Sequence, residues 1–322
     1  MKRLPLLCCV LGFSVNAASA ASAYPARPIR IIDPFPAGGP SDIVARVLSG
    51  RYSEVIGQPV VIDNRGGASG ALGTEIVAKA TPDGYTLLLG PSGALTIQPT
   101  LNPKLPYNVQ RDLEPIGQLT AGPQVIAVNP AVPAKNMQEL IALAKAKPGQ
   151  LNFASGGAGT ANHLAAEVLK LAAGIDIVHV PYKGTGPALT AVISGETQMI
   201  VSSLLPALGP AKSGKLRALA VTSTQRSVAL PDVPTAAESG LPKFETSSWH
   251  GLLAPAKTPR SIVTQLHAAM VKTLSLPDVR ERLTSQGLNV VASTPQQFAD
   301  YIRSETAKYA RVLKQIGLKD AQ

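Results

Sequence analysis

Residues 29–39 read IRIIDPFPAGG and residues 151–160 read LNFASGGAGT, and an apolar helical periodicity follows each of them. Both stretches predict a short strand, a glycine-rich turn and an amphipathic helix. The first turn of a helix has backbone N–H groups without internal partners, and glycine beside it lets an anion come close. Two such turns, widely separated along the chain, predict two halves of a molecule that close on one doubly anionic small molecule.

The first 23 residues have the pattern of a secretory signal. Two basic residues open the chain and an apolar run covers residues 6–15. Small residues ending at Ala23 then fit a cleavage site that leaves Tyr24 as the mature start. Spanning a bilayer takes about 20 apolar residues, so the shorter run argues against a membrane anchor. Both cysteines fall inside this segment, so no disulfide or thiol chemistry is predicted for the mature chain.

The charge of the chain is positive but dispersed. The formal net charge is +10 and falls by two, to +8, once Lys2 and Arg3 are removed with the signal. Aromatic residues make up only 4% of the chain. A nucleic-acid-binding surface needs a basic stripe with stacking rings, so no nucleic acid partner is predicted. The positive charge instead favours weak steering of anions, and about 300 mature residues suffice for two lobes with a core each.

Strand and helix patterns alternate along the chain. Strands are predicted at 29–33, 60–63 and 85–90, with helices at 42–55 and 71–80 between them, which is the βαβαβ signature of a parallel sheet covered by helices. The alternation continues and predicts a second α/β unit, with segments at 124–128, 137–146, 151–154, 162–171, 176–180, 186–194, 198–202 and 216–222. Amphipathic helices are predicted at 261–274 and 295–316.

Enzymatic interpretations have weaker support. Ser92, in GPSGA, lacks the final glycine of a nucleophile elbow. The four histidines have no metal-ligand spacing, so neither a metal site nor a cofactor is predicted. His163, in the first turn of the second helix, is predicted to pack under the glycine-rich turn. Lys183 is predicted to be a solvated lysine, and a cation that reaches the same cleft is the alternative. An exported α/β hydrolase that uses Ser92 or Ser155 with a histidine remains the alternative.

Taken together, these segments resemble the tripartite tricarboxylate transporter substrate-binding proteins, also called Bug-type periplasmic receptors. The resemblance covers the whole mature chain. The matching segments are PFPAGGPSD at 34–42, DNRGGASG at 63–70, TPDGYTLLLG at 81–90, ASGGAGTANHLAAE at 154–167, VPYKGTGPALTAVISG at 180–195, GKLRALAVTS at 214–223, LPDVPTAAESGLP at 230–242 and WHGLLAPAKTP at 249–259.

The resemblance implies the type II periplasmic-binding-protein fold. In that fold two α/β lobes, each a mostly parallel sheet flanked by helices, enclose a ligand cleft. The chain is expected to cross between the lobes near Gly122 and near Ser247. One lobe then contains residues 24–121 and 248–322, and the other contains residues 122–247.

The resemblance also implies which residues hold the ligand. In the family, backbone N–H groups and small hydroxyls of the two turns hold a carboxylate. This maps onto Phe35, Ala37, Gly38 and Gly39 of the first turn, Ser155, Gly156, Gly159 and Thr160 of the second, and Ser92 on the cleft wall. Amino-acid-binding members tend to carry an Asp at the position of Ser202, where it pairs with the ligand's ammonium group. Its absence implies a plain carboxylate.

Two further departures from the family pattern lie close to the expected cleft. Asp33 precedes PFPAGG where an apolar residue is common, and we expect its carboxylate to point away from the ligand into a hydrogen bond. His250 follows Trp249 where tyrosine is usual, and this changes one cleft or hinge contact.

The function that the resemblance implies is that of a periplasmic receptor. It would capture a small organic carboxylate, perform no chemistry on it, deliver it to a membrane transporter and act as a monomer. A receptor that acts only in signalling remains an alternative. The identity of the carboxylate is left open, because backbone donors recognise any carboxylate.

Overall fold

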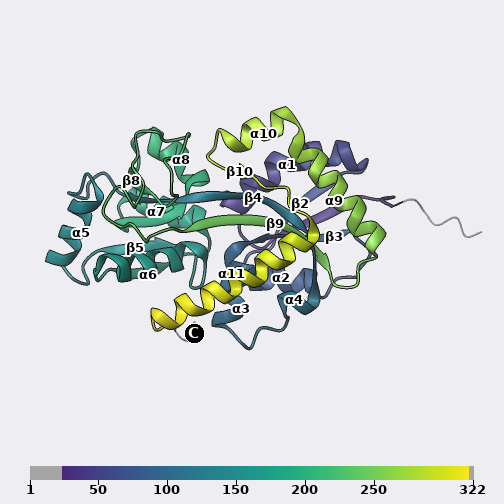
Figure 1. Ribbon diagram of the computed structural model, residues 1–322, viewed down its shortest axis with the longest axis horizontal. Coiled ribbons are helices and arrows are strands. Elements are labelled where there is room, and N and C mark those ends of the chain that lie inside the picture. The colour runs from purple at the N-terminus through teal and green to yellow at the C-terminus, as the bar shows by residue number, and fades with distance from the viewer. Residues whose placement is uncertain (1–23, 319–322) are drawn as a thin grey trace, which may run out of the picture.

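The computed structural model describes residues 24–318, so the predicted signal segment and its cleavage site lie outside the described residues. Figure 1 shows a sheet with helices packed on both faces. None of the helices in residues 24–318 combines the length and apolar character needed to cross a membrane.

The strands are β1 (Ile29–Asp33), β2 (Val60–Asn64), β3 (Thr86–Pro91), β4 (Leu113–Val128), β5 (Asn152–Ser155), β6 (Val178–Pro181), β7 (Met199–Ser203), β8 (Arg217–Val221), β9 (Ser247–Pro255) and β10 (Asn289–Val290). The helices are α1 (Pro40–Ile56), α2 (Ala71–Ala78), α3 (Gln98–Leu101), α4 (Val109–Asp112), α5 (Met137–Ala146), α6 (Ala161–Ala173), α7 (Thr185–Ser194), α8 (Leu204–Lys212), α9 (Arg260–Ser275), α10 (Pro277–Thr284) and α11 (Pro295–Gln315), with a 3-10 turn at Ala68–Gly70 and a π-helical turn, η2, at Gly93–Ile97.

The sheet has the strand order β2-β1-β3-β9-β4-β7-β5-β6, and β8 and β10 also pair with β4. On one side of the sheet, which we call the first half, β1 is parallel to β2 and β3. On the other side, the second half, β5 is parallel to β6 and β7. The parallel pairing predicted from the βαβ pattern is therefore confirmed on both sides. In the middle, β4 and β9 are antiparallel to each other and to their neighbours, so the complete sheet is mixed.

Strand β4 runs through both halves of the sheet, beside β9 (Figure 1). Its first part, from Leu113 to Pro123, pairs with β9, and its second part, from Gln124 to Val128, pairs with β7 and β8. The sequence pattern predicts only this second part, because the first contains prolines and glycines that strands disfavour. Register shifts in the β4–β9 ladder accommodate them.

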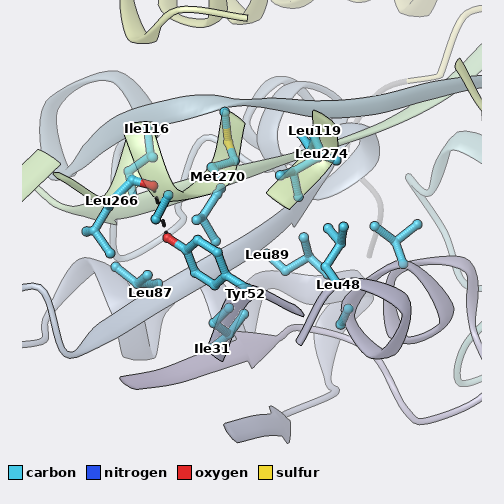
Figure 2. Packing of buried hydrophobic residues seen from close by; sticks show 14 of the residues in the cluster. Ile31, Leu48, Tyr52, Leu87, Leu89, Ile116, Leu119, Leu266, Met270 and Leu274 are labelled. Carbon is cyan, nitrogen blue, oxygen red and sulfur yellow. Dashed lines mark hydrogen bonds between the residues drawn. The ribbon is translucent and has the colours of Figure 1, made fainter. Parts of the chain in front are cut away.

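The main core of the first half lies between the sheet and helices α1, α9 and α10. Figure 2 shows Ile31, Leu89 and Met270 packed around Tyr52. The buried Tyr52 hydroxyl donates to the carbonyl oxygen of Leu266 at 3.1 Å, so this polar group has a partner inside the core. Burying a large apolar side chain contributes roughly 1.5–3 kcal/mol. The cluster therefore fixes α1, and with it the end of the first glycine-rich turn.

Helix α11 covers the opposite face of the sheet. Trp249 and Phe298 meet edge-on with ring centroids 5.7 Å apart, and the indole N–H of Trp249 donates to Glu305 at 3.3 Å. Gly251 of β9 faces the Phe298 ring, which a Cβ atom at this position would overlap. The glycine therefore leaves the space in which α11 packs against the central strands.

The end of α11 reaches the second half of the molecule. Tyr309 and Leu313 pack against Ile97 and Leu101, which lie in η2 and α3, and against Leu164 of α6. In Figure 1 this helix crosses the front of the molecule from one half toward the other. The last helix therefore contacts elements on both sides of the region where the two halves meet.

Candidate functional site

The carboxyl ends of strands from both halves meet at one cavity, which we call the interlobe cavity. β1 and β3 lead to it from the first half, and β5 and β6 lead to it from the second. Ligands of α/β sheets bind outside the carboxyl ends of the strands. The interlobe cavity has a volume of about 30 Å³ and is lined by Phe35, Gly39, Pro40, Ser41, Pro91, Ser92, Gly93, Thr160, Ala161, Asn162, Thr185, Ser248 and His250.

Three helices begin at the wall of the interlobe cavity. Ser41 of α1, Ala161 of α6 and Thr185 of α7 lie in the first turns of these helices, and each lines the cavity. First-turn N–H groups lack an acceptor inside their own helix, and a helix start carries about half a positive charge. Of the described residues that line the cavity, none has a charged side chain. The arrangement therefore suits an anion whose charge is met by backbone dipoles.

A buried carboxylate organises the first glycine-rich turn. Asp33 is 0% exposed and accepts hydrogen bonds from the Ser41 hydroxyl at 2.7 Å, the Asn64 amide at 3.1 Å and the Phe35 N–H at 3.2 Å. Burial raises the pKa of Asp33 to about 7, although the bonds from Ser41 and Phe35 lower it. The expectation that this carboxylate points into hydrogen bonds is confirmed.

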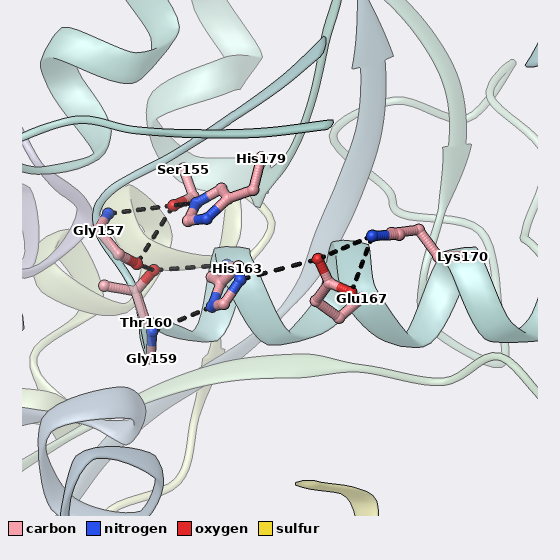
Figure 3. Close-up of polar contacts among 8 residues, drawn as sticks. All are labelled: Ser155, Gly157, Gly159, Thr160, His163, Glu167, Lys170 and His179. Carbon is pink, nitrogen blue, oxygen red and sulfur yellow. Dashed lines mark hydrogen bonds and ion pairs between the residues drawn. The ribbon is translucent and has the colours of Figure 1, made fainter. Parts of the chain in front are cut away.

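Hydrogen bonds among its own residues shape the second glycine-rich turn (Figure 3). The Ser155 hydroxyl lies 2.6 Å from Nε2 of His179 and accepts from the Gly157 N–H at 3.1 Å. The Thr160 hydroxyl donates to the Gly157 carbonyl at 2.8 Å and accepts from the His163 N–H at 3.4 Å, which caps α6. Both hydroxyls therefore hold the turn in shape.

Two stacked histidines lie against this turn. The rings of His163 and His179 are 4.0 Å apart, and the Gly159 N–H donates to Nδ1 of His163 at 3.1 Å. Burial lowers the pKa of His163 to about 3 and that of His179 to about 4. Both rings are therefore neutral near pH 7, and the prediction that His163 packs under the turn is confirmed.

The structure brings four of the predicted contact residues together on the cavity wall, namely Phe35, Gly39, Ser92 and Thr160. Gly39 precedes Pro40, the first residue of α1, and Ser92 precedes η2 where β3 ends. Ser92 is 1% exposed. These four residues come from three separate loops, so the cavity joins segments that are far apart in sequence.

Other predicted contact residues lie around the cavity rather than on its wall. Gly156 lines a second, outer cavity of about 650 Å³, together with Phe35 and the exposed Lys183. Ser155 and Gly159 lie in the second turn with the hydrogen bonds given above. Ser202, on β7, is buried and donates its hydroxyl to the Ser203 carbonyl at 3.0 Å.

The two halves touch beside the cavity. The carbonyl oxygens of Ala37 and Gly38 lie 3.8 and 3.7 Å from the place where a Cβ atom of Gly186 would stand, at the start of α7. A Cβ atom on Gly93 would lie 3.0 Å from the backbone nitrogen of Ala161. The molecule is therefore in a closed arrangement, with the first turn against α7 and η2 against α6.

Sequence reasoning missed four polar residues on the cavity wall, namely Ser41, Asn162, Thr185 and Ser248, whereas His250, expected as a cleft or hinge contact, lies on this wall. Asn162 and Thr185 follow glycine-rich segments at helix starts, and that position was the available signal. The Asn162 amide donates to the Val201 carbonyl at 3.0 Å, and its oxygen accepts from the Thr185 hydroxyl at 3.4 Å. Ser248 and His250 reach the cavity from β9, a strand that the pattern did not predict.

Known proteins share this architecture. Residues 44–318 match the family described as tripartite tricarboxylate transporter family receptor. The periplasmic binding protein BugD is 34% identical with a TM-score of 0.89, over 92% of this chain and 100% of BugD. Protein Rpa4515 of R. palustris, solved with adipate, is 32% identical with a TM-score of 0.90, over 92% of this chain and 99% of that one. MatC from Rhodopseudomonas palustris, with bound malate, is 34% identical with a TM-score of 0.86, over 90% of this chain and 100% of MatC.

The family match overturns the hydrolase alternative, because the matched proteins are receptors and binding proteins. The chain therefore belongs to the tripartite tricarboxylate transporter receptor family, a family of periplasmic solute-binding proteins with the type II two-lobe fold.

Proposed function

We propose that this protein binds a small organic carboxylate in the interlobe cavity and delivers it to a membrane transporter. The observation that carries the proposal is the convergence of three helix starts, those of α1, α6 and α7, on a cavity whose described wall has no charged side chain. A carboxylate accepts hydrogen bonds from backbone N–H groups and gains from the helix dipoles. Contacts from both halves then favour the closed form when the ligand is bound.

The expected number of contacts is sufficient for useful affinity. Hydrogen bonds to a charged group contribute about 1.5–3 kcal/mol each. A micromolar dissociation constant corresponds to about 8 kcal/mol, so four or so bonds supply it after association costs. The predicted contact set remains Phe35, Ala37, Gly38, Gly39, Ser92, Ser155, Gly156, Gly159, Thr160 and Ser202. Within this set, the residues on the cavity wall are proposed to touch the carboxylate, and the others to position the two turns and the ends of the strands.

The ligand class follows from relatives and from the site. Rpa4515 was solved with adipate and MatC with malate, and both ligands are dicarboxylates. Ser202 provides no carboxylate for an ammonium group, which favours plain carboxylates over amino acids. The outer cavity adjoins the interlobe cavity at Phe35, so it offers room for the part of a longer ligand that extends away from the bound carboxylate.

We assign one lobe to residues 24–121 and 248–322, and the other to residues 122–247. The β4–β9 ladder supports this division, because its last pairs are Gly122 with Ser248 and Pro123 with Ser247, after which β4 pairs with β7 and β8. A hinge at these two adjacent crossings would let the lobes open and close as units.

The proposal also includes export with cleavage after Ala23, action as a monomer and a membrane transporter as partner. The alternative to transport is that the ligand-bound protein acts only in signalling.

A carboxylate screen tests the proposal. The mature chain, starting at Tyr24, would be screened by thermal shift against mono- and dicarboxylates that include adipate and malate, and hits would be measured by calorimetry. We expect binding of at least one plain carboxylate, and weaker binding of aspartate and glutamate than of succinate and glutarate, which lack only the amino group. Absence of binding across the panel would overturn the receptor assignment, and tight aspartate binding would overturn the ligand class.

A further inference from the structure

We infer that His250 recognises the ligand directly, by donating a hydrogen bond from Nε2 to an oxygen atom of the bound carboxylate. This inference rests on the proposed function and specifies what the interlobe cavity selects. His250 would then be a specificity residue that favours ligands with an acceptor oxygen at this position over ligands with an ammonium group.

The first observation is the position of the ring. His250 lies on β9 between two neighbouring strands, opposite Thr120 of β4 and Pro91 of β3. It is 0% exposed, yet it lines the interlobe cavity together with Ser92 and Ser248. The imidazole is therefore shielded from bulk solvent and borders the space proposed for the ligand.

The second observation sets the tautomer. Nδ1 of His250 lies 3.4 Å from Oγ1 of Thr120, and within residues 24–318 the Thr120 hydroxyl makes no other hydrogen bond. Thr120 is 0% exposed, and buried hydroxyls are nearly always paired. If Nδ1 carried the proton, the hydroxyl proton of Thr120 would have no acceptor. The hydroxyl therefore donates to Nδ1, and the ring proton lies on Nε2.

The third observation is that Nε2 has no partner. It is buried and makes no hydrogen bond to any residue of the described chain. Leaving a buried donor unpaired is costly, so such a group points to a missing acceptor. Burial also lowers the pKa of His250 to about 4, so the ring stays neutral and donates one proton at Nε2. A carboxylate oxygen in the cavity would satisfy it.

The chemistry explains the selection. An N–H donor pairs with the oxygen of a carboxylate, a carbonyl or a hydroxyl group, each of which has a lone pair. An ammonium group has none, so an amino acid that placed its ammonium beside Nε2 would leave two donors facing each other. No acidic side chain on the described part of the cavity wall could relieve this. Discrimination would thus come from an unfavourable contact with the wrong ligand.

Two variants of the mature chain test the inference. His250→Phe keeps a ring but removes the donor, and His250→Gln keeps an amide N–H close to the position of Nε2. With the tightest plain carboxylate among adipate, malate, succinate and glutarate, calorimetry should show a loss of about tenfold or more for His250→Phe. His250→Gln should retain most of the affinity. The preference for succinate over aspartate should shrink in His250→Phe.

A matched control and a measurement on the unmodified protein complete the test. His267→Phe removes a histidine whose Nε2 lies 3.1 Å from the Ser293 carbonyl, outside the cavity wall, and should leave affinity unchanged. Because His250→Phe could fail to fold, the ¹⁵N resonance of Nε2 in the wild-type ring would also be followed, and it should move on ligand addition. Equal affinity in His250→Phe, or an unmoved Nε2 resonance at saturation, would overturn the inference but leave the receptor function intact. Absence of binding by the wild type would overturn both.

Discussion

The side-chain amide of Gln98 donates a hydrogen bond of 2.6 Å to the carbonyl oxygen of Ala158. Gln98 is the first residue of α3 in the first half of the molecule, and Ala158 lies in the second glycine-rich turn. The bond therefore crosses between the halves without touching the interlobe cavity wall. Opening the lobes must break it, so it contributes to the stability of the closed form.

Gln98→Ala is expected to lower ligand affinity without removing a ligand contact. An intramolecular hydrogen bond contributes about 0.5–1.5 kcal/mol net, so the closed population and the apparent affinity should fall by roughly two- to tenfold. Calorimetry measures the affinity, and small-angle scattering should show a larger radius of gyration without ligand. Gln110→Ala, at an exposed position of α4, is the matched control. Identical affinities in the two variants would contradict a role in closure.

Gly93→Ala is expected to hold the lobes apart. The added Cβ would lie 3.0 Å from the Ala161 nitrogen and 3.2 Å from Cα of Thr160, both in the other half. Since Gly93 also lines the cavity, the methyl group would obstruct closure and should reduce affinity by about tenfold or more, equivalent to about 1.4 kcal/mol. Gly50→Ala, in α1 with open space around it, should change only stability. Normal affinity in Gly93→Ala would show that the closed contact is not needed for binding.

Ser155→Ala is expected to cost stability rather than affinity. Its hydroxyl is the partner of His179 Nε2 and of the Gly157 N–H, so the variant leaves buried polar groups unpaired at a cost of about 1–3 kcal/mol. Chemical denaturation would measure this, with the exposed Ser194→Ala as control. A large loss of affinity with unchanged stability would instead mean that the Ser155 hydroxyl contacts the ligand.

The free energy of unfolding is expected to depend on pH through Asp33. A carboxyl group titrates near pH 3.9 in unfolded chains, about three units below the value for native Asp33, whose pKa burial raises to about 7. Between these values the native protein holds a proton that the unfolded chain has lost, so this group's contribution to stability falls as the pH rises from about 4 to about 7. Asp33→Asn should therefore gain stability relative to wild type across this window, by about 1.4 kcal/mol for each unit of pKa difference at most.

Comparison with the variant is essential in this experiment. Burial lowers the pKa values of His163, His179 and His250. The contribution of these histidines to the free energy of unfolding therefore falls as the pH drops below about 6.5, whereas the contribution of Asp33 falls as the pH rises. The free energies of unfolding of wild type and Asp33→Asn would be measured between pH 4 and pH 8. The histidine contribution is the same in both proteins, so it cancels in the difference. Parallel profiles for the two proteins would mean that Asp33 is already ionised in the native state at low pH.

Local sequence was sufficient to predict the parallel parts of the fold. Helix α1 begins at Pro40 and the predicted helix at 42, because proline is accepted in the first turn and the apolar periodicity becomes visible only after it. The crossing strands could not be predicted in the same way. β9 and the first part of β4 are extended because they pair with each other across more than a hundred residues, and their glycines and prolines conceal this.

The same distinction applies to the site. Gly39 and Thr160 border the helices that their own turns begin, so their positions on the cavity wall could be predicted locally. His250 reaches the wall through the central strands, and only the family resemblance around Trp249 predicted a cleft or hinge contact for it. The bonding of Ser155 could not be predicted either, because His179 competes for its hydroxyl from the next strand of the sheet.

A cavity wall that meets an anion with main-chain N–H groups has an evolutionary consequence. Side-chain replacement does not delete a peptide N–H, except by proline, so random substitution seldom abolishes the capacity to hold a negative charge. Substitutions at positions such as Ser248 and His250 would therefore change which ligand fits, while the main-chain N–H groups of the wall stay in place.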